Sequence, residues 1–235
     1  VSHGDRLRLH MREGEIDVGI ITIPEFLKQQ LKQRTPVSEN ICLDGYCLNI
    51  FLRAIGRGKK LSMPIEAVLS VIQSAFEEGA ADLVQLNMDF CEEPDRGFDR
   101  LAPLVEAIKK RFNTFVALKG FPPLNSGTID LMYASGFDII DFPLGGFSGT
   151  VKSKRKMTAK QVCSALEYAA GVFPPGTVWT DIVLGLDPIA QCKEGVDRLT
   201  DSGIIPLLYL QRESSENLAG YRNLVELAEH MDKAT

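Results

Sequence analysis

One pattern, an apolar strand followed by a polar loop and an amphipathic helix, repeats through residues 81–210. Its apolar strand segments fall at residues 83–88, 115–120, 137–142, 179–185 and 204–210. Strands that alternate with helices in this way are typical of a parallel sheet or a (β/α) barrel. In such folds the loops after the carboxyl ends of the strands carry the chemistry. The repeat therefore predicts functional side chains in five loops: residues 91–94, 119–123, 141–150, 185–188 and 211–215.

The size and composition are those of one globular α/β unit. The chain has 235 residues, of which 45% are hydrophobic and 24% charged, and its net charge of −5 argues against nucleic-acid binding. No apolar run reaches the roughly 18 residues of a membrane span, and no signal peptide is visible. The odd number of cysteines, five, is typical of reduced thiols. We therefore expect a cytoplasmic protein.

The expected partner is a small-molecule ligand, with neither nucleic acid nor a membrane. Outer helices rich in leucine and alanine leave a homodimer or another protein partner open.

The amino-terminal residues follow a different pattern. Within residues 5–23, apolar and polar side chains alternate in two runs, which is typical of a β-hairpin. We expect residues 1–35 to form this hairpin and a helix, with the hairpin closing one end of the barrel. Residues 36–235 are expected to form a TIM-barrel-like (βα)6 partial barrel, whose first strand lies within residues 36–45.

Four ionisable side chains stand at or near the predicted strand ends: Glu93, Lys119, Asp141 and Asp181. An isolated buried charge is costly, so a carboxylate in a barrel strand points into the ligand crevice or toward a polar partner. Carboxylates placed there can perform general acid–base catalysis. Lys119 can anchor an anion, or act as a Schiff-base amine if desolvation lowers its pKa. One hypothesis is therefore a metal-free barrel enzyme that performs acid–base chemistry on a small anionic substrate.

Three cysteines stand in or beside the predicted loops. Cys42 and Cys47 follow the expected first strand, and Cys91 follows the second strand at the same mouth of the barrel. Three thiolates can hold a metal ion, or an iron–sulfur cluster with one iron left open to another ligand. The alternative is three unrelated thiols.

Read in order, several of these motifs resemble the radical S-adenosylmethionine superfamily, in particular its biotin-synthase-like branch. Tyr46 and Cys47 resemble the end of the family's CxxxCxxC loop, and residues 91–94 (Cys-Glu-Glu-Pro) stand where its Gly-Gly-Glu-Pro motif belongs. Residues 182–185 and 203–208 resemble the family's fifth and sixth strands. The chain departs from the pattern where Asn40 and Asp44 occupy the positions of the first two cluster cysteines.

This resemblance implies a (βα)6 barrel that binds S-adenosylmethionine, and it implies a [4Fe-4S] cluster if Cys42, Cys47 and Cys91 rebuild the family's cluster site by a different route. The residues that it implies for cofactor binding are Tyr46, Glu93, Pro94, Gly145, Gly146, Val183, Gly185 and Ile205. The main hypothesis is a ligand-binding or accessory pseudoenzyme of a cofactor-biosynthesis or metabolic system. An active iron–sulfur enzyme with an atypical cluster site and the metal-free acid–base enzyme both stay open as alternatives.

Overall fold

The computed structural model describes residues 6–12, 15–21, 24–33, 40–55, 60–147, 157–210 and 218–234. Its main element is a seven-stranded sheet with the strand order β11-β10-β9-β8-β7-β4-β3. The strands are β3 (Ile41–Asp44), β4 (Cys47–Leu52), β7 (Leu83–Met88), β8 (Phe115–Lys119), β9 (Ile139–Asp141), β10 (Val178–Leu184) and β11 (Ile205–Leu210). All neighbours pair in parallel except β3, which is antiparallel to β4.

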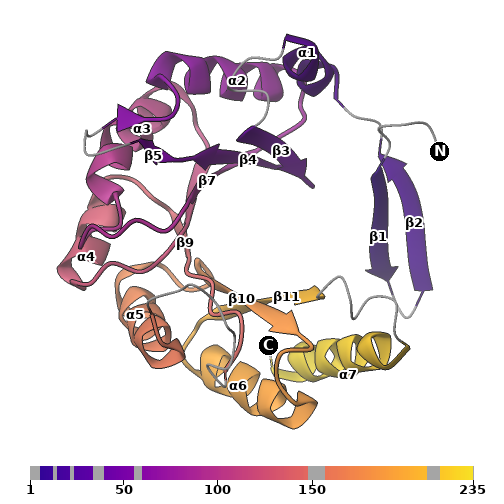
Figure 1. Ribbon diagram of the computed structural model, residues 1–235. Helices are drawn as coiled ribbons and strands as arrows, with labels where there is room; N and C mark the ends of the chain where they lie inside the picture. The colour runs from indigo at the N-terminus through magenta and orange to yellow at the C-terminus, as the bar shows by residue number, and fades with distance from the viewer. Residues whose placement is uncertain are drawn as a thin grey trace.

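A helix follows each parallel strand, with the short strands β5 (Ala54–Ile55) and β6 (Lys60–Leu61) inserted before the first. These helices are α2 (Ile65–Glu77), α3 (Phe98–Arg111), α4 (Gly127–Ala134), α5 (Ala159–Val172), α6 (Ile189–Asp201) and α7 (Leu218–Ala234). Figure 1 shows the sheet curled around an open centre, with the helices outside it and a gap between β11 and β3. The prediction of a (βα)6 partial barrel is confirmed.

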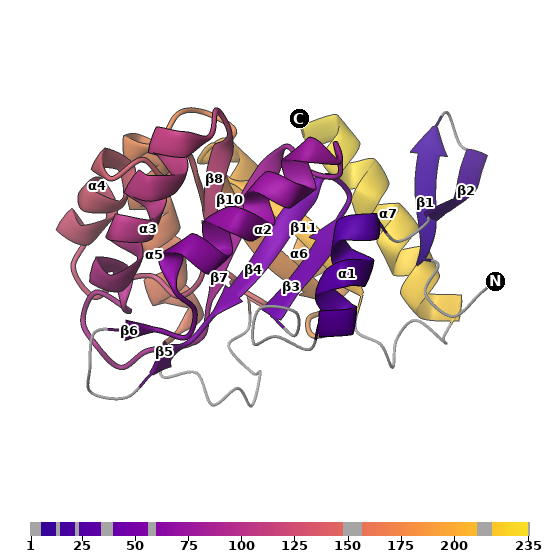
Figure 2. The same cartoon turned by 90° about the horizontal axis from the view of Figure 1, so that it is seen from above.

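The predicted amino-terminal hairpin is present as a separate two-stranded sheet. It consists of β1 (Arg6–Arg12) and β2 (Glu15–Ile21), and α1 (Glu25–Gln33) follows it. In both Figure 1 and Figure 2 the hairpin lies at the open side of the sheet, beside the gap. The expectation that it closes one end of the barrel is therefore wrong.

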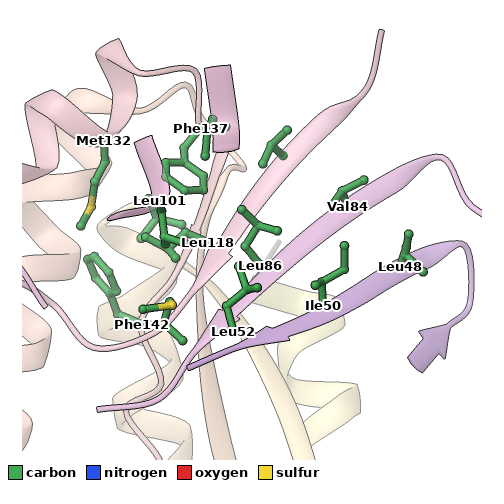
Figure 3. Close-up of a cluster of buried hydrophobic side chains, with 14 of the residues drawn as sticks. Leu48, Ile50, Leu52, Val84, Leu86, Leu101, Leu118, Met132, Phe137 and Phe142 are labelled. Carbon is green, nitrogen blue, oxygen red and sulfur yellow. The ribbon is translucent and has the colours of Figure 1, made fainter. Parts of the chain in front are cut away.

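The hydrophobic core lies between the outer, convex face of the sheet and the helices. Side chains alternate between the two faces of a strand, so every second residue of β4 and β7 points toward the helices. Figure 3 shows these side chains in one buried cluster that also contains Leu101 of α3 and Met132 of α4. Burying a Leu or Ile side chain stabilises a fold by about 1.5–3 kcal/mol, so this layer holds the sheet in its curved form.

Helix α5 begins at a capping box, as the sequence pattern predicts. The Thr158 hydroxyl accepts a hydrogen bond from the Gln161 backbone N–H at 3.3 Å, and the Gln161 side chain accepts one from the Thr158 N–H at 2.8 Å. Two of the helix's free amide donors are satisfied in this way. Within the residues that the structure describes, no helix has both the length and the apolar composition needed to cross a membrane.

Candidate functional site

The register of the parallel strands places four side chains in one row across the concave face, near the carboxyl ends of the strands. Phe51 of β4 pairs with Asn87 of β7, Asn87 with Lys119 of β8, and Lys119 with Asp141 of β9. On the next strand Asp141 pairs with Trp179 of β10, and Asp181 lies two residues beyond Trp179 on the same face. Five strands therefore bring side chains to the edge where α/β folds bind their ligands.

Lys119 bridges two carboxylates at the centre of this row. Its Nζ lies 2.7 Å from Asp141 Oδ2 and 2.5 Å from Asp181 Oδ2. The Asp141 side chain is 1% exposed and that of Asp181 is 15% exposed. Neither Asp141 Oδ1 nor Asp181 Oδ1 has a hydrogen-bond partner within the described part of the chain. Each carboxylate thus directs one oxygen to the lysine and keeps a second acceptor unused.

The charges of this bridge shift the pKa values of Asp141 and Lys119. Burial raises the pKa of Asp141 to about 6, the negative charge of Asp181 adds to this, and Lys119 opposes it. Burial disfavours the charged form of Lys119, but Asp141 and Asp181 outweigh that effect and raise its pKa above the usual lysine value. Lys119 is therefore an ammonium ion at neutral pH, and the condition for a Schiff-base amine, a lowered pKa, is not met.

A buried network of amide side chains lies one layer deeper on the same face. Gln85 Nε2 donates to Asn49 Oδ1 at 2.8 Å and to Asn87 Oδ1 at 3.0 Å, and Asn87 Nδ2 donates to Asn49 Oδ1 at 3.3 Å. These bonds tie β4 to β7 through side chains as well as through the backbone. Because its members hold one another, the network fixes the orientation of Asn87 beside Lys119.

An open cavity of about 420 Å³ lies over this row. It is lined by Asn40, Phe51, Leu52, Arg53, Asn87, Met88, Asp89, Lys119, Gly120, Phe121, Pro143 and Asp181. Arg53 is paired with Asp89 at 3.2 Å. Phe51, with 44% of its surface exposed, presents a large apolar side chain to the cavity. A cavity with apolar walls and a few converging polar groups is the usual form of a small-molecule site.

Tyr209 of β11 flanks the lysine from the other side. Lys119 Nζ lies 5.2 Å from the centroid of the Tyr209 ring, within cation–π range. Val183, a predicted cofactor contact, is the residue that pairs with Tyr209 on β10.

Glu93 and Pro94 lie in the loop after β7, as predicted, but they contact residues outside the cavity. The Glu93 carboxylate forms an ion pair with Arg100 of α3, whose side chain is buried. The Pro94 carbonyl accepts a hydrogen bond from the Leu124 N–H at 2.8 Å, which joins this loop to the loop after β8. Among described residues the cavity lining includes neither Glu93 nor Pro94. The structure thus brings Lys119, Asp141 and Asp181 together and gives Glu93 a separate partner.

Gly145 and Gly146, also predicted to bind a cofactor, lie where the loop after β9 is held against β10. Gly145 has φ 77°, and its N–H and carbonyl bond to Asp181 O and Val183 N at 2.8 and 2.7 Å. A Cβ atom on Gly146 would approach Asp187 Oδ2 to 2.8 Å. The positive φ therefore accounts for glycine at position 145, and the lack of space for a side chain accounts for glycine at position 146.

The next residue, Phe147, fixes the same loop to helix α6. Its N–H donates to Asp187 Oδ2 at 2.6 Å, and its ring packs directly on Gly195. A Cβ atom at Gly195 would overlap the Phe147 ring, so only glycine fits there unless the ring or its loop shifts.

The predicted cofactor residues Tyr46, Ile205 and Gly185 lie at opposite ends of the sheet. Tyr46 sits in the turn before β4, and Ile205 begins β11, so both are at the amino end of the parallel strands. Gly185 follows β10 at the carboxyl end, with φ 95°. A single small ligand at the carboxyl end does not reach the first two.

The three cysteines do not share one mouth of the barrel. Cys42 and Cys47 belong to the antiparallel hairpin β3–β4, and Cys47 pairs with Leu83 at the amino end of the sheet. Cys91 follows β7 at the carboxyl end. Burial, with the charges of Asp44 and Cys42, raises the pKa of Cys47 to about 12, so its thiol stays protonated.

Comparisons with known proteins bear on the fold. No protein-family model matches the sequence, and no curated protein matches it significantly. One similar solved structure is the catalytic domain of a family GH18 chitinase from the fern Peteris ryukyuensis, with 14% identity and a TM-score of 0.50 over 77% of this chain. Another is dihydropteroate synthase (DHPS) of Yersinia pestis with a pterine-sulfa conjugate, with 17% identity and a TM-score of 0.46 over 77% of this chain. The chain covers 66% of each of those chains. At this identity the chitinase likeness shows a shared fold alone.

These findings correct the family assignment. The resemblance to the radical S-adenosylmethionine superfamily is wrong, because no protein-family model matches the sequence and the cysteines that would hold the cluster lie at opposite ends of the parallel sheet. Residues 6–12, 15–21, 24–33, 40–55, 60–147, 157–210 and 218–234 contain no group of three His, Cys, Asp or Glu that could hold a metal ion. The interpretations of this chain as a radical S-adenosylmethionine, iron–sulfur or metal-binding protein are therefore wrong as well. This includes the cluster site predicted on Cys42, Cys47 and Cys91.

The amide network is the part of the site that sequence reasoning missed. Gln85 and Asn87 stand two residues apart in the strand LVQLNM, and Asn49 occupies an equivalent place in CLNIFL. Polar residues at a spacing of two in an otherwise apolar strand indicate that one face of the strand is polar. That signal is in the sequence, and it marks the concave face.

Proposed function

We propose that this protein is a metal-free barrel enzyme that performs acid–base chemistry on a small molecule bound over Lys119 and Asp181. The observation that carries the proposal is the buried Asp141–Lys119–Asp181 bridge at the carboxyl ends of three neighbouring strands, open to a cavity on the Asp181 side. Ionisable groups that perturb one another inside a cleft are typical of catalytic sites.

Asp181 is assigned as the general base, since it lines the cavity and its Oδ1 has no hydrogen-bond partner among the described residues. The Lys119 ammonium also lines the cavity and is assigned to stabilise negative charge that develops on the substrate. Asp141 is fully buried behind them and is a positioning residue. With its pKa near 6, Asp141 gains or loses a proton close to neutral pH and so sets the net charge of the bridge.

Proton abstraction can be tested without knowledge of the whole reaction. The purified protein is incubated in D2O with a panel of small carbonyl compounds, and loss of the carbon-bound proton beside each carbonyl is followed by ¹H NMR. We expect the wild-type protein to exchange the protons of at least one compound. Asp181→Asn should slow this exchange at least about 100-fold, as is typical when a general base is removed.

Glu93→Gln is the matched control, because it removes a carboxylate at the same end of the sheet that is paired with Arg100 instead of Lys119. We expect this variant to exchange protons at the wild-type rate. Exchange that survives in Asp181→Asn, or no exchange with any compound of the panel, would refute the proposal.

A further inference from the structure

The charges around the cavity favour a positively charged ligand. Arg53 and Asp89 neutralise each other at 3.2 Å, while the single charge of Lys119 is shared by Asp141 and Asp181. With both of those carboxylates ionised, these five groups carry a net charge of −1. The four of these groups that line the cavity sum to zero, and the negative excess comes from Asp141, which is buried behind them. The field of such an excess attracts ligands of the opposite sign. Because both lysine and arginine are already paired, the anionic substrate predicted from the sequence gains no support from this charge distribution.

The hydrogen-bonding groups of the cavity favour a ligand that donates. Asp181 Oδ1 and Asp141 Oδ1 are buried acceptors without a partner in the part of the chain that the structure describes. Leaving such an atom unsatisfied costs about 1–3 kcal/mol, and more when the group is charged. Because the Asp181 side chain lines the cavity, a rotation of its carboxylate turns this buried oxygen toward a ligand N–H and replaces the cost by a charge-assisted hydrogen bond. Ligand carboxylate or phosphate groups have no donor for that position.

The walls of the cavity favour a flat organic group. Phe51, Phe121 and Pro143 stand around the polar floor formed by Asn87, Lys119 and Asp181. Phe51 is 44% exposed, and its ring lies on the strand that pairs with the strand of Asn87. An organic cation gains from an aromatic face as well as from a carboxylate, because the ring's quadrupole attracts positive charge.

We propose that this cavity binds a small planar organic cation, an amidinium or protonated amino-heterocycle, with its N–H groups on Asp181 and its flat face against Phe51 and Phe121. The proposal rests on the proposed function for the position of the site, and it adds the chemical class of the substrate. It also predicts the order of affinities within a series of ligands that share one shape.

Benzamidinium, benzamide and benzoate form such a series, since they share a phenyl ring and a planar head group and differ in charge and donors. Binding of each to the wild-type protein is measured by calorimetry and ligand-observed NMR at pH 8, where Asp141 is ionised beside Lys119 and Asp181. We expect benzamidinium to bind at least about tenfold more tightly than benzamide, and benzoate to bind weakest. Asp181→Asn should lower the benzamidinium affinity about tenfold or more, because the ligand loses its charged acceptor.

Asp201→Asn is the matched control, as it removes one exposed carboxylate at the end of α6 and leaves the cavity intact. Benzamidinium affinity should be unchanged in this variant. Tighter binding of benzoate, equal binding of benzamide and benzamidinium, or an Asp181→Asn variant with wild-type affinity would each overturn the inference. The binding order and the deuterium exchange are separate readouts, so a failure of the ligand class is distinguishable from a failure of the acid–base function.

Discussion

The two faces of strand β7 differ in almost every property, although their residues alternate along one short segment. Leu86 points to the convex face and is completely buried among the side chains of the core. Asn87, the next residue, points to the concave face, where it belongs to an amide network and lines the cavity. The convex face is saturated with apolar contacts, whereas the concave face keeps charged acceptors that lack hydrogen-bond partners in the described chain. Stability and function are thus divided between alternate residues of the same strands.

The largest effect is expected on the convex face. Leu86→Ala should lower the free energy of unfolding by about 4 kcal/mol, because it removes a buried side chain and leaves a cavity among packed neighbours. Urea titration followed by circular dichroism measures this. The matched control is Leu131→Ala on α4, whose side chain is 58% exposed and should cost less than about 1 kcal/mol. Equal losses in the two variants would contradict the division between the faces.

Asp141 should give the second largest effect, and it depends on pH. The folded-state pKa of about 6 lies above the ordinary value of 3.8, so the folded protein holds a proton that the unfolded chain has released between these values. The stability from this proton is complete below pH 3.8 and is lost as the pH rises through 6. Relative to Asp141→Asn, the wild-type protein should therefore lose roughly 2.5 kcal/mol between pH 4 and pH 7.

Urea titrations of both proteins across that pH range measure this difference. Asp201→Asn serves as the control, because it also removes one carboxylate but at an exposed position at the end of α6. A difference that grows in favour of the wild-type protein as the pH rises would show that Lys119 lowers the pKa of Asp141 more than burial raises it.

Removal of the lysine should give the smallest of the three effects. Lys119→Met leaves Asp141 and Asp181 without a shared cation, and we expect a loss of about 2 kcal/mol at pH 8. The loss should be smaller at pH 5, since Asp141 then takes up a proton. Thermal unfolding at the two pH values measures both quantities. The control Lys193→Met breaks the exposed pair with Glu226 and should cost less than about 1 kcal/mol at either pH. If Lys119→Met lowers the stability equally at both pH values, the protonation of Asp141 does not depend on Lys119.

The fold was largely predictable, because the repeat of strand, loop and helix follows from local patterns. What the pattern missed is the direction of the strand predicted within residues 36–45: this strand, β3, is antiparallel to β4 after a turn at Gly45 and Tyr46, and β4 is the first parallel strand. A short edge strand and a loop have similar sequences, so the first parallel strand was expected too early. This shift placed Cys47 at the wrong end of the sheet and led to the incorrect cluster site.

The residues of the candidate site that stand at strand ends were predictable from the sequence. The side-chain contacts that those residues make with other elements were not. Lys119 and Asp141 end neighbouring strands, so parallel register alone brings them together. Glu93 also follows a strand end, but Arg100 on α3 reaches back to it. That contact depends on the angle at which the helix leaves its loop, which no local pattern reports. The amide network was available from the spacing of Gln85 and Asn87, and only the register shows that Asn49 joins it.

The contact of Phe147 with Gly195 has a consequence for how such a protein can diverge. Gly195 lies on an outer helix, far in sequence from the strand that supplies Asp141, and yet the Phe147 ring occupies the space of its missing side chain. A mutation at Gly195 must therefore be accompanied by a smaller residue at position 147, by a rotated Phe147 ring or by a displacement of the loop, which is bonded to the backbone of Asp181 through Gly145. A change at a buried position of an outer helix would thus be transmitted toward the strand that carries the proposed base.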